Sequence, residues 1–241
     1  MKIGIFGDSF ADCSWYPWAK TNTNIGPGWP ELLAINYKLI NYAHGGSSLF
    51  YSYQLFLKHH TQFDKVIFVT TAAERFYTNL VETKTIFHVV PGTDFKKRSQ
   101  IEKDQGHYTN AKIVEAASDY VLYALDSKKE KLFSDLMVDN IARIRNDTII
   151  IPALHTKDTS TITLGDISLL ENTFYNMSDN LSKLHNLTDL RKCHLTDENN
   201  HMVYEKIIDI VTGKSNHFKL TNEDFKIPSK PLQSYWGVSK A

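Results

Sequence analysis

The sequence predicts an α/β domain with a doubly wound parallel sheet. Four short runs rich in Ile, Val and Phe are continuous rather than alternating, as expected for strands that are buried on both faces. Segments with helical spacing separate these runs, and strands that alternate with helices favour parallel pairing through right-handed crossovers. The four expected strands are residues 2–6, 38–43, 65–71 and 148–153.

Five helices are expected between and after these strands. Pro30 suits the first position of a helix. The last helix has acidic residues in its first turn and Gly213 at its end, which are typical signals of a helix start and stop. The expected ranges are 30–36, 48–60, about 110–145, 166–185 and 197–213.

A polar, turn-rich stretch over residues 76–109 interrupts the alternation of strands and helices. We expect it to be a helical or loop insertion after the third strand that serves as a lid or an interface. The prediction is therefore a single α/β domain over residues 1–213 that contains this insertion, followed by a C-terminal tail over 214–241.

The balance of charges argues against a nucleic-acid partner or a membrane. The chain has 27 basic and 27 acidic residues, so it has no global field that would attract a phosphate backbone or an anionic lipid surface. No apolar run approaches the ~18 residues that indicate a membrane-spanning helix. The first residues lack a basic stretch followed by a long apolar one, so no signal peptide is predicted. We expect a soluble, cytoplasmic protein, with release by lysis as an alternative, and the composition indicates no oligomeric state.

Candidate functional residues follow the strands, because sites in open parallel sheets form beyond the carboxyl ends of the strands. A serine hydroxyl becomes a nucleophile when a base takes its proton, and histidine is the natural base near neutral pH. Polar or glycine-rich segments of this kind occur at residues 7–9, 44–48, 70–75 and 155, and at 193–196 before the last expected helix.

Four segments together resemble the SGNH (GDSL-type) hydrolases, a family of serine esterases. IFGDSF (5–10) resembles the first block of the family, INYAHGGSS (40–48) its second block and CHLTDENNHMVYEKI (193–207) its last block, while GPGWPELLA (26–34) resembles the opening of its first helix. The order and the spacing agree, with the serine near the start and the histidine near the end. The resemblance implies a flavodoxin-like fold of the SGNH type and ester hydrolysis that requires no metal or organic cofactor.

This resemblance gives roles to three residues. Ser9 is implied to be the nucleophile of an acyl-enzyme mechanism, and His194 is implied to be the base that relays its proton. The backbone N–H groups of Ser9 and Gly46 are implied to form the oxyanion hole. Glycine suits the second of these positions because the backbone has to come close to the substrate.

The identity of the base and of its acidic partner is left open by the sequence. Family members usually have Asp three residues before the catalytic His, whereas this chain has Arg191 in that place. The candidates that could orient His194 in place of this Asp are Asp189 and a backbone carbonyl. His201, on the last expected helix, and His155, after the fourth strand, are the alternative bases.

The third block of the family usually contributes an Asn to the oxyanion hole, and this chain has TTAAERF (70–76) instead. Thr71 and Arg75 are the candidate donors in its place, while the alternative is a local ion pair of Glu74 with Arg75 that braces the loop. The candidate substrate-binding residues are thus Asp8, Thr71, Arg75 and Trp15. For Asp8 the alternative is a brace of the turn, and for Trp15 it is packing in the core.

The chain has two cysteines, Cys13 shortly after Ser9 and Cys193 directly before His194. They are too few for a disulfide framework, although one long-range bridge is compatible with their number. We expect them to be neighbours in space and to have no catalytic role. With the nearby His residues they have the wrong spacing for a structural zinc site.

The predicted activity is hydrolysis of a small acyl ester, for which the resemblance makes an O-acetylated glycan the leading substrate. The acyl chain and the alcohol are not indicated further. One rival function is a binding module of the same fold for a glycan or an acylated ligand, favoured by the missing Asn and Asp. The second is nucleotide or phosphate binding by the loops after the first two strands, although neither loop matches a glycine-rich phosphate motif.

Overall fold

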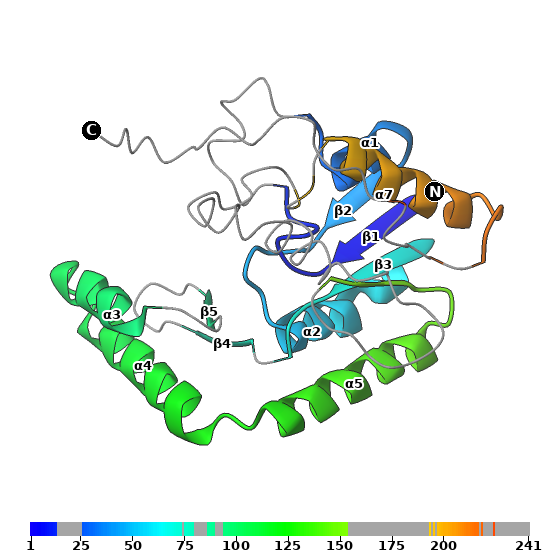
Figure 1. Ribbon diagram of the computed structural model, residues 1–241. Helices are drawn as coiled ribbons and strands as arrows, with labels where there is room; N and C mark the ends of the chain where they lie inside the picture. Colours follow the sequence, from blue (N-terminus) through cyan, green and yellow to red (C-terminus); the bar gives the residue numbers. More distant parts are fainter. Residues whose placement is uncertain are drawn as a thin grey trace.

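The described part of the chain forms a parallel sheet with helices on both faces (Figure 1). The sheet has four strands, and a two-stranded antiparallel hairpin lies apart from it. This confirms the predicted α/β class. The expected helix over 166–185 and nearly all of the expected tail lie outside the described residues. In this computed structural model the described residues are 1–13, 26–73, 75–79, 86–89, 94–153, 193, 195, 197–216, 218 and 224.

The strand order of the main sheet is β2-β1-β3-β6, and all neighbouring strands are parallel. Each of the four strands corresponds to a predicted one. The order reverses between β1 and β3, so the carboxyl end of β1 lies at the switch point of the sheet, where ligands of such folds bind. The bounds are β1 Lys2–Phe6, β2 Lys38–Asn41, β3 Lys65–Thr70 and β6 Ile149–Pro152.

Alternate residues of the central strands fill two separate cores. Ile3 and Ile5 of β1 pack in one apolar cluster with Trp29 of α1 and Ile207 of α7. Phe6 belongs to the other cluster, which includes residues of α2 and α5. Burial on both faces explains the continuous apolar runs of the sequence. The helices are α1 Trp29–Asn36 and α7 Asp197–Val211 on one side of the sheet, and α2 Leu49–His59 and α5 Ser127–Ile144 on the other (Figure 1).

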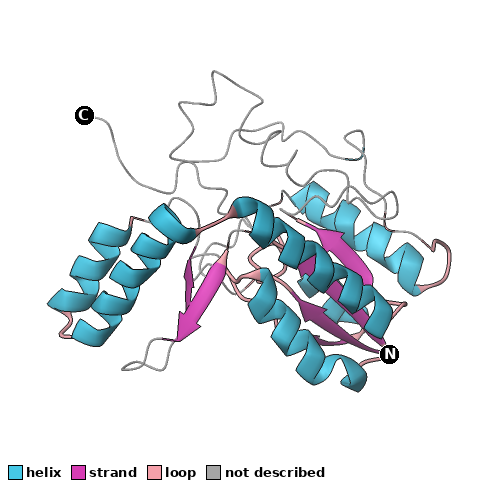
Figure 2. Ribbon diagram, turned by 90° about the horizontal axis from the view of Figure 1, so that it is seen from below, coloured by secondary structure: helices cyan, strands magenta, loops and turns pink. Residues whose placement is uncertain are grey.

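The segment after β3 contains more regular structure than the predicted loop or helical insertion. It begins with the antiparallel pair β4 (Phe76–Asn79) and β5 (Ile86–Val89), followed by α3 (Phe95–Asp104) and α4 (Tyr108–Asp119). Both views show α3 and α4 side by side and away from the main sheet (Figures 1 and 2).

The single helix expected over about 110–145 is wrong, because the chain forms α4, a π-helical segment (Tyr120–Ala124) and then α5. The cause of the break is a new helix start. The carboxylate of Asp126 accepts hydrogen bonds from the backbone N–H groups of Lys128 and Lys129, which caps the first turn of α5. Among the described helices, none is long and apolar enough to cross a membrane.

Candidate active site

The chain turns sharply where β1 ends, and Ser9 lies in this turn. Gly7 adopts φ +153°, and a Cβ at this position would lie 2.6 Å from the Cβ of Val69 in the neighbouring strand. The carbonyl oxygen of Asp8 accepts hydrogen bonds from the N–H groups of Ala11 at 3.0 Å and Asp12 at 2.9 Å. Glycine is therefore required for the close approach to β3, and the turn leaves Ser9, 6% exposed, at the carboxyl edge of the sheet.

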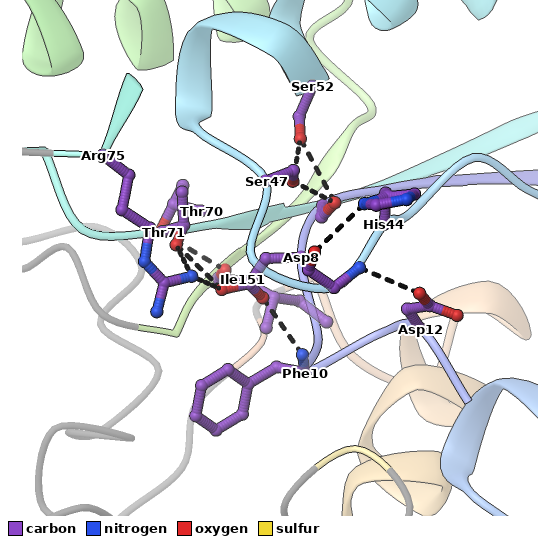
Figure 3. A network of polar contacts seen from close by, with 12 residues as sticks. Asp8, Phe10, Asp12, His44, Ser47, Ser52, Thr70, Thr71, Arg75 and Ile151 are labelled. Carbon is purple, nitrogen blue, oxygen red and sulfur yellow. Dashed lines mark hydrogen bonds and ion pairs between the residues drawn. The ribbon is translucent and has the colours of Figure 1, made fainter. Parts of the chain in front are cut away.

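The side chain of Asp8 is completely buried and is held by three donors (Figure 3). Its Oδ1 accepts a hydrogen bond from the N–H of Phe10 at 3.0 Å. Its Oδ2 accepts from the hydroxyl of Thr71 and from Nη1 of Arg75, each at 2.8 Å. Because these bonds occupy both carboxylate oxygens, the geometry favours the brace over the substrate-binding role for Asp8.

Arg75 supplies the charge that compensates buried Asp8. Its Nη1 also donates to the Thr71 hydroxyl at 2.8 Å, so that the three side chains form one closed network. Thr71 is itself buried, and its hydroxyl donates its one proton to Asp8 and accepts from Arg75. The guanidinium keeps further donors, and its buried Nε has no hydrogen-bond partner among the described residues. The alternative partner, Glu74, lies outside the described residues.

The turn after β2 is fastened to the turn after β1. The carbonyl oxygen of Gly7 accepts hydrogen bonds from the N–H of His44 at 3.0 Å and from the hydroxyl of Ser47 at 2.8 Å. The carboxylate of Asp12 accepts from the N–H of Gly45 at 2.8 Å (Figure 3). Asp12 was not singled out by the sequence, where nothing distinguishes it from a surface carboxylate.

Gly46, the second candidate oxyanion donor, lies in this fastened turn. It has φ +76°, a left-handed conformation that glycine adopts without the steric penalty of a side chain. Its N–H has no hydrogen-bond partner among the described residues. The amide of Asn41, at the end of β2, donates to the carbonyl oxygen of Ala11 at 2.6 Å and adds a further tie between the two turns.

The loop before α7 lies against the same turn. The Sγ atoms of Cys13 and Cys193 are 3.0 Å apart, which confirms that the two cysteines are neighbours. Both Cys193 and Leu195 are buried in the cluster that contains Phe10 and Ala11. His194 itself lies outside the described residues, but the residues on both sides of it are packed beside the turn of Ser9.

Helices α1 and α7 hold this loop in place. The side chain of Asn200 donates to the carbonyl oxygen of Leu195 at 3.1 Å and accepts from the backbone N–H of Trp29 at 2.9 Å. The indole Nε1 of Trp29 donates to the carbonyl oxygen of Phe10 at 2.9 Å. One continuous chain of contacts therefore joins the start of α7 to the turn after β1.

The other candidate site residues from the sequence are His201, Trp15, His155 and Asp189. His201 is exposed on α7, and its side chain has no hydrogen bond or ion pair with a described residue. Trp15, His155 and Asp189 lie outside the described residues. Among the described residues, no group of three or more His, Cys, Asp or Glu is arranged to hold a metal ion.

A cavity of about 640 Å³ adjoins Arg75 on the side of the sheet covered by α2 and α5. This volume is within the range of small-molecule sites, about 300–1,000 Å³. Arg75 thus contacts the Asp8 network and also lines the cavity. Aromatic side chains line it together with a second arginine: Phe50, Tyr53, Phe76, Phe133 and Arg143.

No known family model matches this chain, and no curated protein matches it in sequence. Among solved structures, the crystal structure of an acetyl xylan esterase is similar over 88% of this chain and 100% of its own chain, with a TM-score of 0.33 and 17% identity. A likeness at this score is too weak to carry functional information. The basis for a function is therefore the set of contacts around Ser9.

Proposed function

We propose that the protein is a serine hydrolase of the SGNH (GDSL) type that cleaves a small acyl ester. The observation that carries this proposal is the meeting of three distant segments around Ser9. The turn after β1 is hydrogen-bonded to the turn that contains Gly46, and it packs against Cys193 and Leu195, the two neighbours of His194. A nucleophile, an oxyanion donor and a base are needed together for acyl transfer.

In the proposed mechanism, the Oγ of Ser9 attacks the carbonyl carbon of the ester while His194 takes the hydroxyl proton. His194 then gives this proton to the leaving alcohol, and water releases the acyl group in the reverse sequence. The N–H groups of Ser9 and Gly46 stabilise the oxyanion. Loss of one such donor reduces turnover by about 10²–10³-fold.

Asp8 and Arg75 have different parts in this proposal. Asp8 positions the turn of Ser9, because its buried carboxylate accepts hydrogen bonds from the N–H of Phe10 and the hydroxyl of Thr71. Arg75 holds Asp8 and is the candidate replacement for the missing Asn, since its guanidinium has donors beyond Nη1. An O-acetylated glycan is the proposed substrate, with Trp15 as an additional contact.

A fluorophosphonate probe tests the proposed nucleophile directly. Wild type should gain one adduct in its intact mass, and Ser9→Ala and His194→Ala should gain none. Ser99→Ala is the matched control, because Ser99 is a buried serine of α3 whose hydroxyl is bonded to Glu115, away from Ser9. This control should be labelled like wild type.

Two results would decide against the proposed mechanism. Labelling of Ser9→Ala would show that another nucleophile reacts. A folded wild type that is never labelled would favour the alternative, a binding module for a glycan or acylated ligand, for which the missing Asn in the loop after β3 is the supporting observation. Release of acetate from O-acetylated glycans then identifies the substrate of a labelled protein.

A further inference from the structure

The two cysteines of the chain form a dithiol between the turn after β1 and the loop before α7. Their Sγ atoms are 3.0 Å apart. A disulfide bond has a length of about 2.05 Å, so the sulfurs have to approach by only about 1 Å to become bonded. The two sulfur atoms also differ in access, since Cys193 is 0% exposed and Cys13 is half-buried.

The backbone at Cys193 is in a conformation that disfavours a side chain. Its φ is +56°, and among the described residues it is the one non-glycine residue with a positive φ. Glycine would adopt this conformation without a steric penalty. A thiol at such a position, in contact with a second thiol, points to a use for the side chain itself.

We propose that Cys13 and Cys193 are a redox modification site, at which a low-molecular-mass disulfide such as oxidised glutathione converts the dithiol into an intramolecular disulfide. Exposure sets the order of the steps. The thiolate of Cys13 attacks one sulfur of oxidised glutathione, forms a mixed disulfide and releases one glutathione thiolate. Cys193 then loses its proton to solvent, and its thiolate attacks the Cys13 sulfur and expels the second glutathione thiolate.

The reaction is balanced, because two protein thiols are oxidised to one disulfide while one glutathione disulfide is reduced to two thiols. Burial raises the pKa of the Cys193 thiol, and its hydrogen bond with Cys13 adds to this effect. Cys193 is thus the poorer first attacker and acts once the mixed disulfide is formed beside it. The bond would fasten the turn of Ser9 to the residue directly before His194.

The proposed bond joins residues that are 180 positions apart in the sequence. A cross-link over so long a loop restricts the unfolded chain strongly, so the oxidised protein should have a melting temperature higher by on the order of 10 °C. The site is independent of ester hydrolysis. Formation of the disulfide is measured by mass and by thermal stability, not by activity. A protein without esterase activity could still form this disulfide, and an active esterase could fail to form it.

The test is oxidation of the full chain with oxidised glutathione, followed by alkylation of free thiols and intact mass. Wild type should lose two hydrogen atoms, take up no alkylating agent, carry no glutathione and stay monomeric on a non-reducing gel. The peptide pair that contains Cys13 and Cys193 should be found cross-linked. A reductant should restore both thiols.

Two variants separate the steps. Cys193→Ser should keep a stable glutathione adduct on Cys13, because the second thiol is missing. Cys13→Ser should stay unmodified while folded, because Cys193 is buried. A wild type that retains glutathione on Cys13, or forms only disulfide-linked dimers, would overturn the proposal. So would a Cys13→Ser protein that is modified as fast as Cys193→Ser.

Discussion

Replacement of Arg75 by methionine should destabilise the folded protein by about 3–5 kcal/mol, because the buried carboxylate of Asp8 would lose its cationic partner. Asp8 is 0% exposed and Arg75 is 12% exposed at the side chain. Arg75 makes two hydrogen bonds of 2.8 Å, one to the charged carboxylate and one to the Thr71 hydroxyl. Both bonds are charge-assisted because the guanidinium is ionised, and at about 1.5–3 kcal/mol each they give a similar sum.

Equilibrium urea unfolding of a double-mutant cycle measures this effect. Asp8→Asn combined with Arg75→Met should be about 2 kcal/mol more stable than the two single losses predict, since the pair is then removed as a unit. Lys214→Met is the control, because its 3.7 Å ion pair with Asp209 is exposed at both side chains and its loss should change stability by about 0.5 kcal/mol or less. Additive losses, or an Arg75→Met protein as stable as the control, would refute the reasoning.

Two further predictions concern backbone fit and pH. Gly7→Ala should cost about 3 kcal/mol or prevent folding, because a Cβ would lie 2.6 Å from the Cβ of Val69 at φ +153°. Gly106→Ala should cost only about 1 kcal/mol, because a Cβ at this position, with φ +79°, has no neighbouring atom within 4 Å. Equal melting temperatures of the two variants would contradict the claim that the close approach to Val69 requires glycine at position 7. Burial lowers the pKa of His60, and the charge of Arg145 lowers it further, so the unfolded state binds the proton more readily than the folded state. The free energy of unfolding should therefore fall as the pH drops below about 6.5. His60→Gln should reduce this fall, as measured by urea unfolding at several pH values, and identical pH profiles of the two proteins would contradict the prediction.

The main sheet was predictable because its strands are buried on both faces and leave continuous apolar runs in the sequence. β1 has the predicted bounds of 2–6. β2 ends at Asn41, before its predicted end at 43. Beyond Asn41 the N–H groups of Tyr42 and His44 still bond to the carbonyl oxygens of Ile5 and Gly7, but the N–H of Ala43 bonds to the side chain of Asn41.

The region between β3 and α5 was harder to predict, for two physical reasons. β4 and β5 are short strands of four residues each, and they give little periodic signal. Helical spacing continues through α4 into the π-helical segment, so periodicity alone predicts one long helix. The signal that could have divided it is Asp126 followed by Ser127, because both residue types favour a helix start.

At the candidate site, motif order led to Ser9 and Gly46, but the supporting contacts were not predictable. Asp8 and Arg75 are 67 positions apart, and a sequence gives no reason to prefer this distant carboxylate to the adjacent Glu74. The bond between Asp12 and Gly45 spans 33 positions in the same way. Such pairings depend on how parallel strands bring their ends together, which only the folded chain specifies.

The contacts between the turn after β1 and the start of α7 also bear on how the protein is made. Trp29 and Asn200 are 171 positions apart, so the ribosome completes the turn of Ser9 long before its covering residues exist. Closure of such long loops is costly until the partner segment arrives. Under the proposed function, the nascent chain should therefore be inactive toward esters until α7 has been synthesised and has docked.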